Sequence, residues 1–446
     1  MSETKFKDIA RQIEQRIDEG VYPPNAKLPP HRELAADLDT TPATISKAYK
    51  LLAEMNRVES FVGRGTFVVG ESQLNQAIQP AESDAQFNFS ILQPYVSKNL
   101  ASLRSAYQKA SMSFSPELLA YTDHSGHLSH REAGAIWAHR YGLSAATASN
   151  VLLTNGAQHA LSLLIETLTQ PGDVIAVEAL TYPGILAIAS LAGRQVIGVD
   201  MDNDGLIPSV LEEVLRSHKP KLVIAIPSHQ NPTGITMPIQ RRKAIAAIIE
   251  HSSAYLVEDD IYGFLNEATL PAICHWLPEK GIHISGLSKA ISPAMRCGFV
   301  VAPDHLLPTL NAHIRANIWL ASPINFIVAE QLISSGEAFS MAEAQRDIAK
   351  QRQTIAKDIL GDVISKADGY HVWVTLPAHW QQERFVMEAK QRDLIVTSGS
   401  YFAAGDSHPN CIRLSLMSIK NNDALTQGLK ELKSLLDSHV VSLAPF

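Results

Sequence analysis

The chain has 446 residues, 46% of them hydrophobic, and this length predicts two or three units with a sizeable buried core. Its formal net charge of −7 excludes a basic coat over the whole protein, although a local basic face remains compatible with it. The three cysteines, Cys274, Cys297 and Cys411, lie far apart in the sequence, which excludes a disulfide scaffold and fits a reducing compartment.

The N-terminal segment MSETKFKDIA is polar and has neither an apolar core nor a cleavage site, so no signal peptide is expected. Apolar runs such as LVIAI (222–226) are far shorter than a membrane-spanning segment. We therefore expect a soluble, cytoplasmic protein with no membrane partner.

The first 70 residues predict three helices and a hairpin. Apolar residues recur at helical spacing from Phe6 to Ile17, and Gly20 predicts the end of that helix. A short helix is expected around residues 31–38, and Thr41 followed by Pro42 is typical of the start of a third. Two short β runs then flank Gly63-Arg64-Gly65. This order predicts a winged helix-turn-helix.

A second domain follows a linker. The stretch ESQLNQAIQPAESDAQ (71–86) has few apolar anchors and predicts a linker between domains 1–70 and 87–446. Beyond it, short β-branched runs alternate with helical stretches, which predicts an α/β domain with a mainly parallel sheet. The runs are DVIAVE (173–178), QVIGVD (195–200), KLVIAIP (221–227), AYLVED (254–259), IHIS (282–285) and CGFVVA (297–302). Such sheets bind ligands at the loops beyond the carboxyl ends of their strands.

The winged helix contains the side chains expected at DNA. In a helix-turn-helix the second helix enters the major groove and the preceding helix rests on the backbone. The residues expected to contact DNA are Arg32, Thr41, Thr44, Ser46, Lys47, Arg64 and Gly65. Arg64, beside Gly65, is suited to the minor groove. The alternative is a packing or dimerisation module with solvated charges, because residues 1–70 hold ten Lys and Arg against ten Asp and Glu.

The segment KLPPHRELAADLDTTPATISKAYKLL, followed by GRGTFVV, resembles the GntR-type winged helix over residues 5–69. That resemblance implies double-stranded DNA as a partner and a dimer that reads two half-sites. The chain departs from the family at Pro42 and Ser46, where members often carry arginine. Fewer bidentate guanine readers therefore remain.

Four loops of the second domain carry polar or reactive groups. Lys289 follows IHIS among small residues, where it can form a Schiff base with a carbonyl cofactor, and Arg296 can clamp a phosphate. Asp259 can hold a pyridine nitrogen protonated, with Tyr262 three residues on. Asn231 lies in SHQNPTG after KLVIAIP. The segment 154–158 precedes an apolar helix whose N–H groups can bind phosphate. Taken singly, each has an ordinary explanation as a surface loop, a turn or a helix cap.

In this order the loops resemble fold-type I aminotransferases, which use pyridoxal phosphate, across residues 87–446. The matching segments are Thr154-x-Gly-Ala-Gln158, Tyr182-Pro183, Asn231-Pro-x-Gly, Asp259-x-x-Tyr262, Ser288-Lys289 and Arg413-Leu414. The resemblance implies that Lys289 forms the aldimine, that Asp259 pairs with the pyridine nitrogen, and that Asn231 and Tyr262 hold the ring hydroxyl. It further implies ring stacking by Tyr182, phosphate contacts from Ala157, Gln158, Ser288 and Arg296, and a ligand carboxylate on Arg413.

By the same resemblance Tyr121 reaches the phosphate of a partner subunit, which implies a homodimer. The chain departs from the family at Gly286, where many relatives carry a serine that donates to the phosphate, so Ser285 or Ser288 would have to substitute. The histidines show no metal-ligand spacing, and no metal is expected. Most histidines are expected at the surface or in hydrogen bonds; a ligand contact is considered only for His229, two residues before Asn231, and it is the less favoured alternative there.

A winged helix joined to an aminotransferase-like domain resembles the MocR subgroup of GntR regulators. This implies a transcription regulator that senses an amine, an amino acid or pyridoxal phosphate through Schiff-base chemistry on Lys289. A ligand that favours one dimer geometry would then reposition the winged helices. The alternative is a working aminotransferase with an accessory winged helix. A DNA-binding protein with an inert second domain is disfavoured, because the lysine, aspartate and arginine are all retained.

Overall fold

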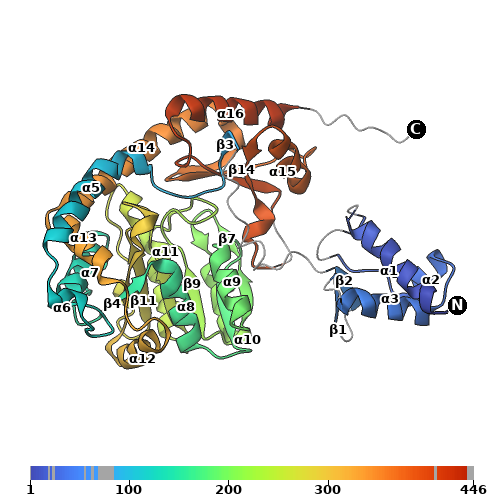
Figure 1. Cartoon of the computed structure of the whole chain (residues 1–446), viewed down its shortest axis with the longest axis horizontal. Coiled ribbons are helices and arrows are strands. Elements are labelled where there is room, and N and C mark those ends of the chain that lie inside the picture. Colours follow the sequence, from blue (N-terminus) through green and yellow to red (C-terminus); the bar gives the residue numbers. More distant parts are fainter. Residues whose placement is uncertain are drawn as a thin grey trace. The chain divides into compact units, whose positions relative to one another are not determined.

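The computed structural model describes residues 2–18, 21–22, 26–54, 57–61, 65–68, 85–405 and 409–438. Contacts within the chain divide it into two compact units, Met1–Gln79 and Pro80–Phe446. We call them the N-terminal unit and the C-terminal unit and describe each by itself. Figure 1 carries the element labels used below.

The N-terminal unit has three helices followed by a hairpin, which confirms the predicted winged helix. Its elements are α1 (Ser2–Asp18), α2 (His31–Asp37), α3 (Pro42–Glu54), β1 (Val58–Phe61) and β2 (Gly65–Val68). The two strands pair antiparallel. The helices share one core because their apolar residues recur at helical spacing. Its buried members include Ile9, Ile13, Leu34, Ile45, Ala48, Tyr49 and Leu52.

Helix α3 begins where the sequence predicts. Thr41 Oγ1 accepts a hydrogen bond from the backbone N–H of Thr44 at 3.3 Å, so the side chain caps the helix. Pro42 is the first helical residue, a position at which its missing N–H costs nothing. Helix α1 ends at Asp18, and Gly20, its predicted stop, lies outside the described residues.

A seven-stranded sheet forms the centre of the C-terminal unit. Its order is β4 (Val151–Asn155), β12 (Cys297–Val301), β11 (Gly281–Gly286), β10 (Tyr255–Asp259), β9 (Leu222–Ala225), β5 (Val174–Glu178) and β6 (Gln195–Val199). All neighbours pair parallel except β12, which is antiparallel to both β11 and β4. The mainly parallel sheet is therefore confirmed, and all six predicted runs are strands. Strand β4 was not predicted.

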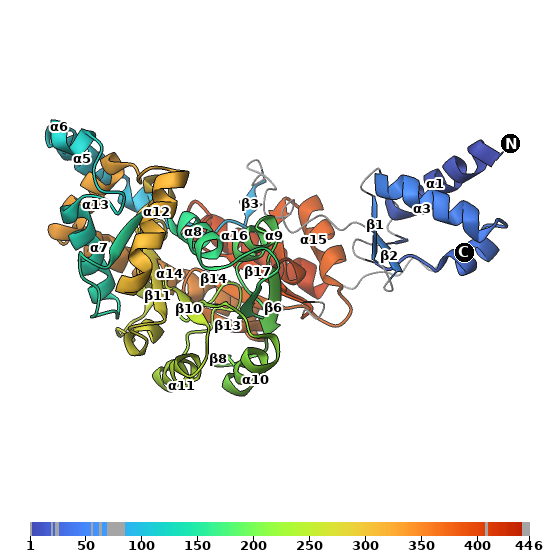
Figure 2. The same ribbon diagram turned by 90° about the horizontal axis from the view of Figure 1, so that it is seen from below.

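Helices cover both faces of this sheet, which explains why its strands are apolar almost throughout. One face packs against α8 (Ala157–Leu168), α9 (Pro183–Leu191) and α12 (Leu307–Asn317). The other packs against α5 (Val96–Met112), α7 (Leu128–Arg140), α10 (Pro208–His218), α11 (Ile239–Glu250) and α13 (Pro323–Ser334). Figure 2 shows α10 and α11 on one side of the strands and α8 and α9 on the other.

A smaller antiparallel sheet completes the unit. Its order is β13 (Ile364–Asp368), β14 (His371–Thr375), β17 (Cys411–Ser415) and β16 (Thr397–Ser398), and its core includes α14 (Glu337–Leu360), α15 (Gln382–Gln391) and α16 (Asn422–Asp437). Strand β3 (Phe87–Asn88) pairs parallel with β15 (Leu394–Ile395). In Figure 1, β3 accordingly lies in blue among the red C-terminal elements, near α16 and β14.

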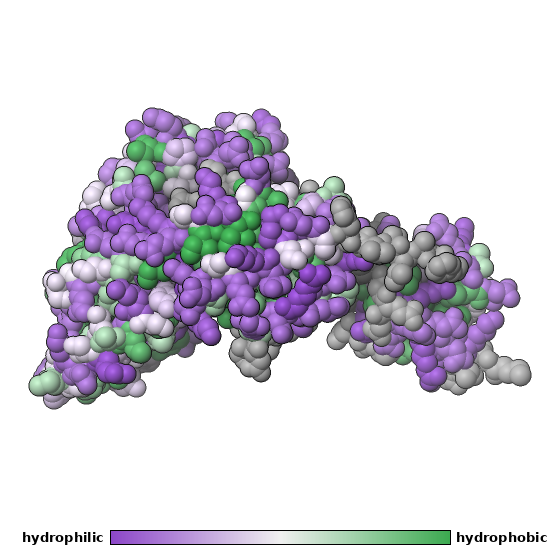
Figure 3. All heavy atoms as spheres, turned by 90° about the horizontal axis from the view of Figure 1, so that it is seen from above, coloured by the Kyte–Doolittle hydropathy of each residue, from purple (hydrophilic) through white to green (hydrophobic). Residues whose placement is uncertain are grey.

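The remaining elements are short. They include α6 (Pro116–Leu119), β7 (Met201–Asp202), β8 (Gly205–Leu206) and the 3-10 helix Pro293–Met295. Within the described ranges, every helix is too short or too polar to cross a membrane. The face in Figure 3 is mainly hydrophilic, with hydrophobic residues in patches between polar ones.

Candidate functional site

The predicted loops converge at one edge of the seven-stranded sheet. Asp259 ends β10, Lys289 follows β11, and Asn231 follows β9. These strands are parallel, so their carboxyl ends meet at the same edge. Because β12 is antiparallel to both its neighbours, β4 runs in the direction of β11. Gly156, which follows β4 and precedes α8, therefore lies at this edge as well.

The Lys289 amine is held inside this site. Its Nζ donates a hydrogen bond to the carbonyl of Leu92 at 2.6 Å and lies 6.0 Å from the centre of the Tyr262 ring. Desolvation lowers the pKa of Lys289 to about 8, and the charge of Arg413 acts in the same direction. More of the amine is thus neutral at neutral pH than for an ordinary lysine, and the neutral amine is the form that attacks a carbonyl.

Asp259 presents an unsatisfied carboxylate oxygen. The residue is 2% exposed, and its Oδ1 has no hydrogen-bond partner in the described part of the chain. Burial raises the pKa of Asp259 to about 7, helped by Asp260, while the charge of Lys289 opposes the rise. An acceptor without a donor fits a protonated ring nitrogen. Tyr262 is buried beside it, and burial raises the pKa of its hydroxyl, which stays a neutral donor.

Arg296 lies against the start of α8. Its Nη2 donates to the carbonyl of Asn155 at 3.1 Å, and its Nη1 donates to that of Pro293 at 3.3 Å. A Cβ added to Gly156 would lie 2.4 Å from Arg296 Nη2, so only glycine lets the guanidinium approach this backbone. Gly156 also has a φ of 82°, which favours glycine. A guanidinium beside the N–H groups of Ala157 and its neighbours suits a phosphate.

Tyr182 and Gln158 meet above Gly184. A Cβ added to Gly184 would lie 2.3 Å from the Tyr182 ring and 2.7 Å from Gln158 Oε1. Burial and the nearby Asp259 carboxyl raise the pKa of Tyr182 to about 12, so the ring stays neutral. Tyr182, predicted to stack on the cofactor ring, and Gln158, predicted to contact the phosphate, therefore both lie next to Gly184.

The structure explains the glycine at position 286. A Cβ there would lie 2.7 Å from the carbonyl oxygen of Cys297, so a serine does not fit without a backbone shift. Ser285 points to the opposite face of β11 from Gly286, because side chains alternate along a strand. Its buried Oγ has no hydrogen-bond partner among the described residues. Ser288, in the loop next to Lys289, is the remaining hydroxyl for a phosphate.

Arg413 on β17 faces the lysine loop from the smaller sheet. It is 6% exposed; Nη1 donates to Asn231 Oδ1 at 3.0 Å, and Nη2 donates to Thr397 Oγ1 at 3.3 Å and to the carbonyl of Ser90. Its Nε has no partner in the described ranges. Burial lowers the pKa of Arg413 to about 10, which leaves it charged at neutral pH. The guanidinium is therefore a buried cation suited to a carboxylate.

The two remaining candidate residues differ in their exposure. Tyr121 is on the surface, 83% exposed, with its ring 5.3 Å from that of Trp319. His229 is buried and has a φ of 45°, and it packs against Gly369. Among the described residues, no group of three His, Cys, Asp or Glu side chains is arranged for a metal ion.

Sequence reasoning missed the segment from Ser90 to Tyr95. The carbonyls of Ser90 and Leu92 accept the hydrogen bonds from Arg413 and Lys289. Residue types carry no signal for such contacts, because every residue supplies a carbonyl.

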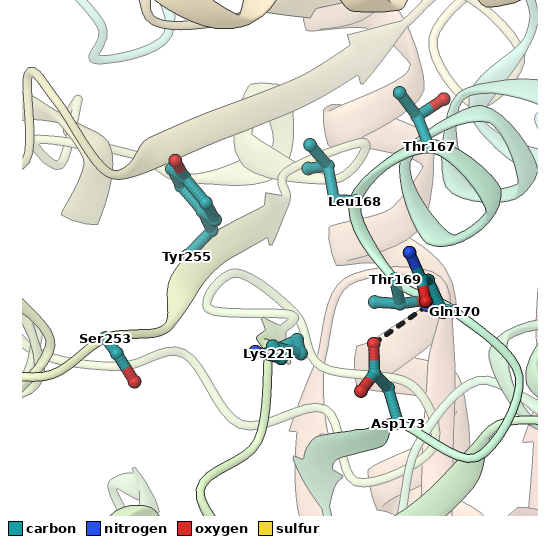
Figure 4. Close-up of a pocket in the computed structure, with 8 residues that line it drawn as sticks. All are labelled: Thr167, Leu168, Thr169, Gln170, Asp173, Lys221, Ser253 and Tyr255. Atoms are coloured by element: carbon teal, nitrogen blue, oxygen red, sulfur yellow. Dashed lines mark hydrogen bonds between the residues drawn. The ribbon is translucent and has the colours of Figure 1, made fainter.

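A surface hollow of about 470 Å³ lies at the other end of the sheet. Its lining residues are Thr167, Leu168, Thr169, Gln170, Asp173, Lys221, Ser253 and Tyr255, drawn in Figure 4. Lys221 precedes β9 and Tyr255 begins β10, so the hollow is at the amino ends of the strands. It is separate from the cluster around Lys289.

On the N-terminal unit, the predicted DNA contacts lie on or near α2 and α3. Arg32, Thr41, Ser46 and Lys47 are exposed, and Thr44 is half-buried. The hydroxyls of Thr41 and Thr44 lie 2.8 Å apart and bond to each other. Gly65 begins β2, opposite Phe61, whereas Arg64 lies outside the described residues.

Comparison with known families accounts for both units. Residues 5–68 match the bacterial regulatory proteins of the gntR family, and residues 84–429 match aminotransferase class I and II. The chain belongs to the aminotransferase class I and II family and joins it to a GntR helix-turn-helix domain, as in MocR-type regulators.

Individual relatives align with most of the chain. The uncharacterized HTH-type transcriptional regulator YdeF of Bacillus subtilis is 29% identical over 97% of this chain and 94% of its own. PdxR of Corynebacterium glutamicum, named a pyridoxine biosynthesis transcriptional regulator, is 26% identical over 91% and 90%. The solved kynurenine aminotransferase of Pyrococcus horikoshii has a TM-score of 0.74 at 23% identity, covering 82% of this chain and 94% of that one, and thus shares the fold.

Proposed function

We propose that the protein is a pyridoxal-phosphate-dependent transcription regulator. The carrying observation is that Lys289, Asp259 and Arg413 converge in one buried site of a chain that also has a GntR domain. In this proposal residues 1–70 bind DNA, residues 71–86 link the two domains, and residues 87–446 bind the cofactor and an effector. Of the linker, residues 71–84 lie outside the described part of the structure.

The arrangement of the site supports the proposed cofactor contacts. The bound cofactor supplies a carbonyl for a Schiff base and a ring that acts as an electron sink. Lys289 provides the neutral amine, and the unpartnered oxygen of Asp259 accepts from the ring nitrogen. Asn231 keeps its side-chain N–H₂ for the ring hydroxyl, because its oxygen is bonded to Arg413. The phosphate contacts are Ala157, Gln158, Ser288 and Arg296, Tyr262 also donates to the ring hydroxyl, and Tyr182 stacks on the ring.

The effector is an amine, an amino acid or the cofactor itself. Arg413 supports an amino acid, because a buried guanidinium with an unpartnered Nε gains most from an ionised carboxylate. Ligand binding at this site favours one dimer geometry over another and so repositions the winged helices on their half-sites.

A homodimer is supported by exposed apolar side chains around α5, α6 and α7. They include Leu100, Tyr107, Met112, Phe114, Leu119, Tyr121 and Leu128. A concentration of apolar residues on a surface is typical of a protein interface. Tyr121 on this surface would reach the phosphate in the partner subunit. Each subunit contributes one winged helix, with Arg32, Thr41, Thr44, Ser46, Lys47, Arg64 and Gly65 at the DNA.

A working aminotransferase is the second candidate, since the groups that transamination requires are present. One titration separates the two. Purified protein is loaded with pyridoxal phosphate, and its visible absorbance is followed while a panel of amino acids and amines is added. A regulator gives a stable spectral change without keto acid. Release of keto acid with conversion to the pyridoxamine form would make it an enzyme, and no change with any amine would make the cofactor itself the signal. If Lys289→Ala still responded to effector as the unmodified protein does, the Schiff-base proposal would be overturned.

A further inference from the structure

Two buried amide side chains lie next to the lysine loop. Asn99 on α5 is 1% exposed, and Gln345 on α14 is 0% exposed. Gln345 Nε2 donates to Asn99 Oδ1 at 3.2 Å, and this contact fixes the orientation of the Asn99 amide. Asn99 Nδ2 then donates to the carbonyls of Ala290 at 3.1 Å and Ile291 at 2.9 Å. The carbonyl groups of the two residues that follow Lys289 are thereby tied to the helices.

Gln345 also holds the segment that accepts the lysine hydrogen bond. Its Oε1 accepts from the backbone N–H of Tyr95 at 2.7 Å, and its Nε2 donates to the carbonyl of Tyr95 at 3.1 Å. Three residues earlier, the Leu92 carbonyl accepts from Lys289 Nζ at 2.6 Å. The far side of Tyr95 is anchored independently, because its hydroxyl donates to the Lys420 carbonyl at 2.6 Å.

These contacts form a closed ring. It runs from Lys289 along the chain to Ala290 and Ile291, through Asn99 and Gln345 to Tyr95, back along the chain to Leu92, and across to the lysine amine. Only an amide can serve in this position, because it accepts one N–H and donates to several carbonyl oxygens without a charge. A lysine side chain has four rotatable bonds, so a ring that fixes both its backbone and its acceptor narrows the positions of Nζ.

We propose that Asn99 and Gln345 are positioning residues for the Lys289 amine. The proposal rests on the assignment of Lys289 as the Schiff-base lysine. Neither amide touches the cofactor or the effector in this role. They act by holding the lysine loop and the segment from Leu92 to Tyr95 in one fixed relation, so that Nζ is presented to the cofactor carbonyl in a single orientation.

The test compares two variants that each remove buried side-chain hydrogen bonds at nearly constant volume. Gln345→Met removes the ring contacts at nearly constant volume. Thr169→Val is the control, because Thr169 is also buried, its hydroxyl donates to the carbonyl of Ile165 at 2.5 Å and accepts from Arg194 Nε at 2.7 Å, and it lies at the opposite end of the large sheet from Lys289. Both variants are examined for melting temperature, for amide hydrogen exchange without cofactor, and for the rate at which added pyridoxal phosphate produces visible absorbance.

Both variants are expected to melt at lower temperature. Only Gln345→Met is expected to speed exchange at the Tyr95 amide and to slow cofactor attachment, roughly five- to tenfold, the range that corresponds to about one net hydrogen bond. Asn99→Ser, a milder change in the other half of the ring, is expected to slow attachment in the same direction. If Gln345→Met does not fold, Asn99→Ser is compared with the unmodified protein in its place.

The proposal is overturned if Gln345→Met or Asn99→Ser attaches the cofactor at the rate of the unmodified protein while melting earlier. That result would make the amides purely structural. If the unmodified protein never produces the absorbance, the assignment of Lys289 fails instead. In that case the labelling rate of Lys289 by an amine-acylating reagent, followed by mass spectrometry, still tests the positioning: equal rates in the unmodified protein and Gln345→Met overturn it.

Discussion

Asn231 and Arg413 are 182 residues apart in the sequence, yet Asn231 Oδ1 accepts a hydrogen bond from Arg413 Nη1 at 3.0 Å. The contact joins the loop after β9 to the smaller antiparallel sheet. It also joins the residue proposed for the cofactor hydroxyl to the residue proposed for the effector carboxylate. A ligand carboxylate that draws the Arg413 guanidinium away from Asn231 would therefore alter the proposed contact between Asn231 and the cofactor hydroxyl.

Replacing Arg413 should separate carboxylate recognition from amine recognition. Arg413→Gln is expected to weaken the binding of an amino-acid effector by about 30-fold or more, because a buried charge-assisted pair contributes at least about 2 kcal/mol. The matching amine without a carboxylate should keep its affinity within about twofold of the unmodified protein. Absorbance titration of cofactor-loaded protein measures both. Equal losses for the two ligands would show that Arg413 supports the fold and does not read the ligand.

Cofactor attachment should depend on pH through Lys289. The pKa of this amine is lowered to about 8, and only the neutral amine attacks, so the rate should rise from pH 7, reach half its plateau near pH 8, and level off above. Arg413→Gln removes a positive charge that lowers this pKa, and the midpoint should move to higher pH. Stopped-flow absorbance gives the profile. A rate that does not change between pH 7 and 9 would contradict the assignment.

Asp259 should oppose folding of the cofactor-free protein. Its pKa is raised to about 7, well above the usual value for an aspartate, so the unfolded chain loses this proton at lower pH than the folded chain. The resulting destabilisation of the folded state grows as the pH rises towards 7 and reaches its full size above pH 7. Asp259→Asn should therefore raise the melting temperature more at pH 8 than at pH 5. The same variant should bind pyridoxal phosphate at least about tenfold more weakly, since a neutral amide no longer pairs with the ring nitrogen as a charge.

Serine at position 286 should not improve cofactor binding. The added Cβ would meet the carbonyl of Cys297 at 2.7 Å, and overpacking of this kind costs about 1–3 kcal/mol. Gly286→Ser is thus expected to lower the melting temperature without raising cofactor affinity. Ser288→Ala is the companion variant and should weaken the phosphate contact. Tighter cofactor binding by Gly286→Ser would show that the strand accommodates the side chain.

Lys47 should contribute charge to DNA binding and little base preference. Lys47→Ala is expected to weaken binding to all sequences similarly and to reduce the slope of log affinity against log salt by about 1. Lys357→Ala, an exposed lysine on α14, is the control and should leave the slope unchanged. Fluorescence anisotropy over a salt series measures both. A loss confined to one DNA sequence would instead assign Lys47 to a base contact.

The sequence predicts those parts of the structure that local chemistry decides. Asp259 ends a β-branched run, and Lys289 and Asn231 follow two others. Because the carboxyl ends of parallel strands meet at one edge of a sheet, the sequence alone predicts that these residues lie close together. Thr41 and Pro42 begin a helix for reasons within one turn. The contacts of Asn99 with Gln345 span 246 residues and leave no periodic pattern. Strand β4 was not predicted, because the sequence VLLTN is equally compatible with a segment that leads into an apolar helix.

The two units are completed at different times during synthesis, because the chain is made from its N-terminus. The winged helix is complete at Val68, whereas the site around Lys289 lacks Arg413 until β17 is made. At ordinary translation rates roughly 20–70 s separate the two residues at the ribosome. Each new chain therefore completes the residues of its GntR domain well before all residues of the site around Lys289 have been made.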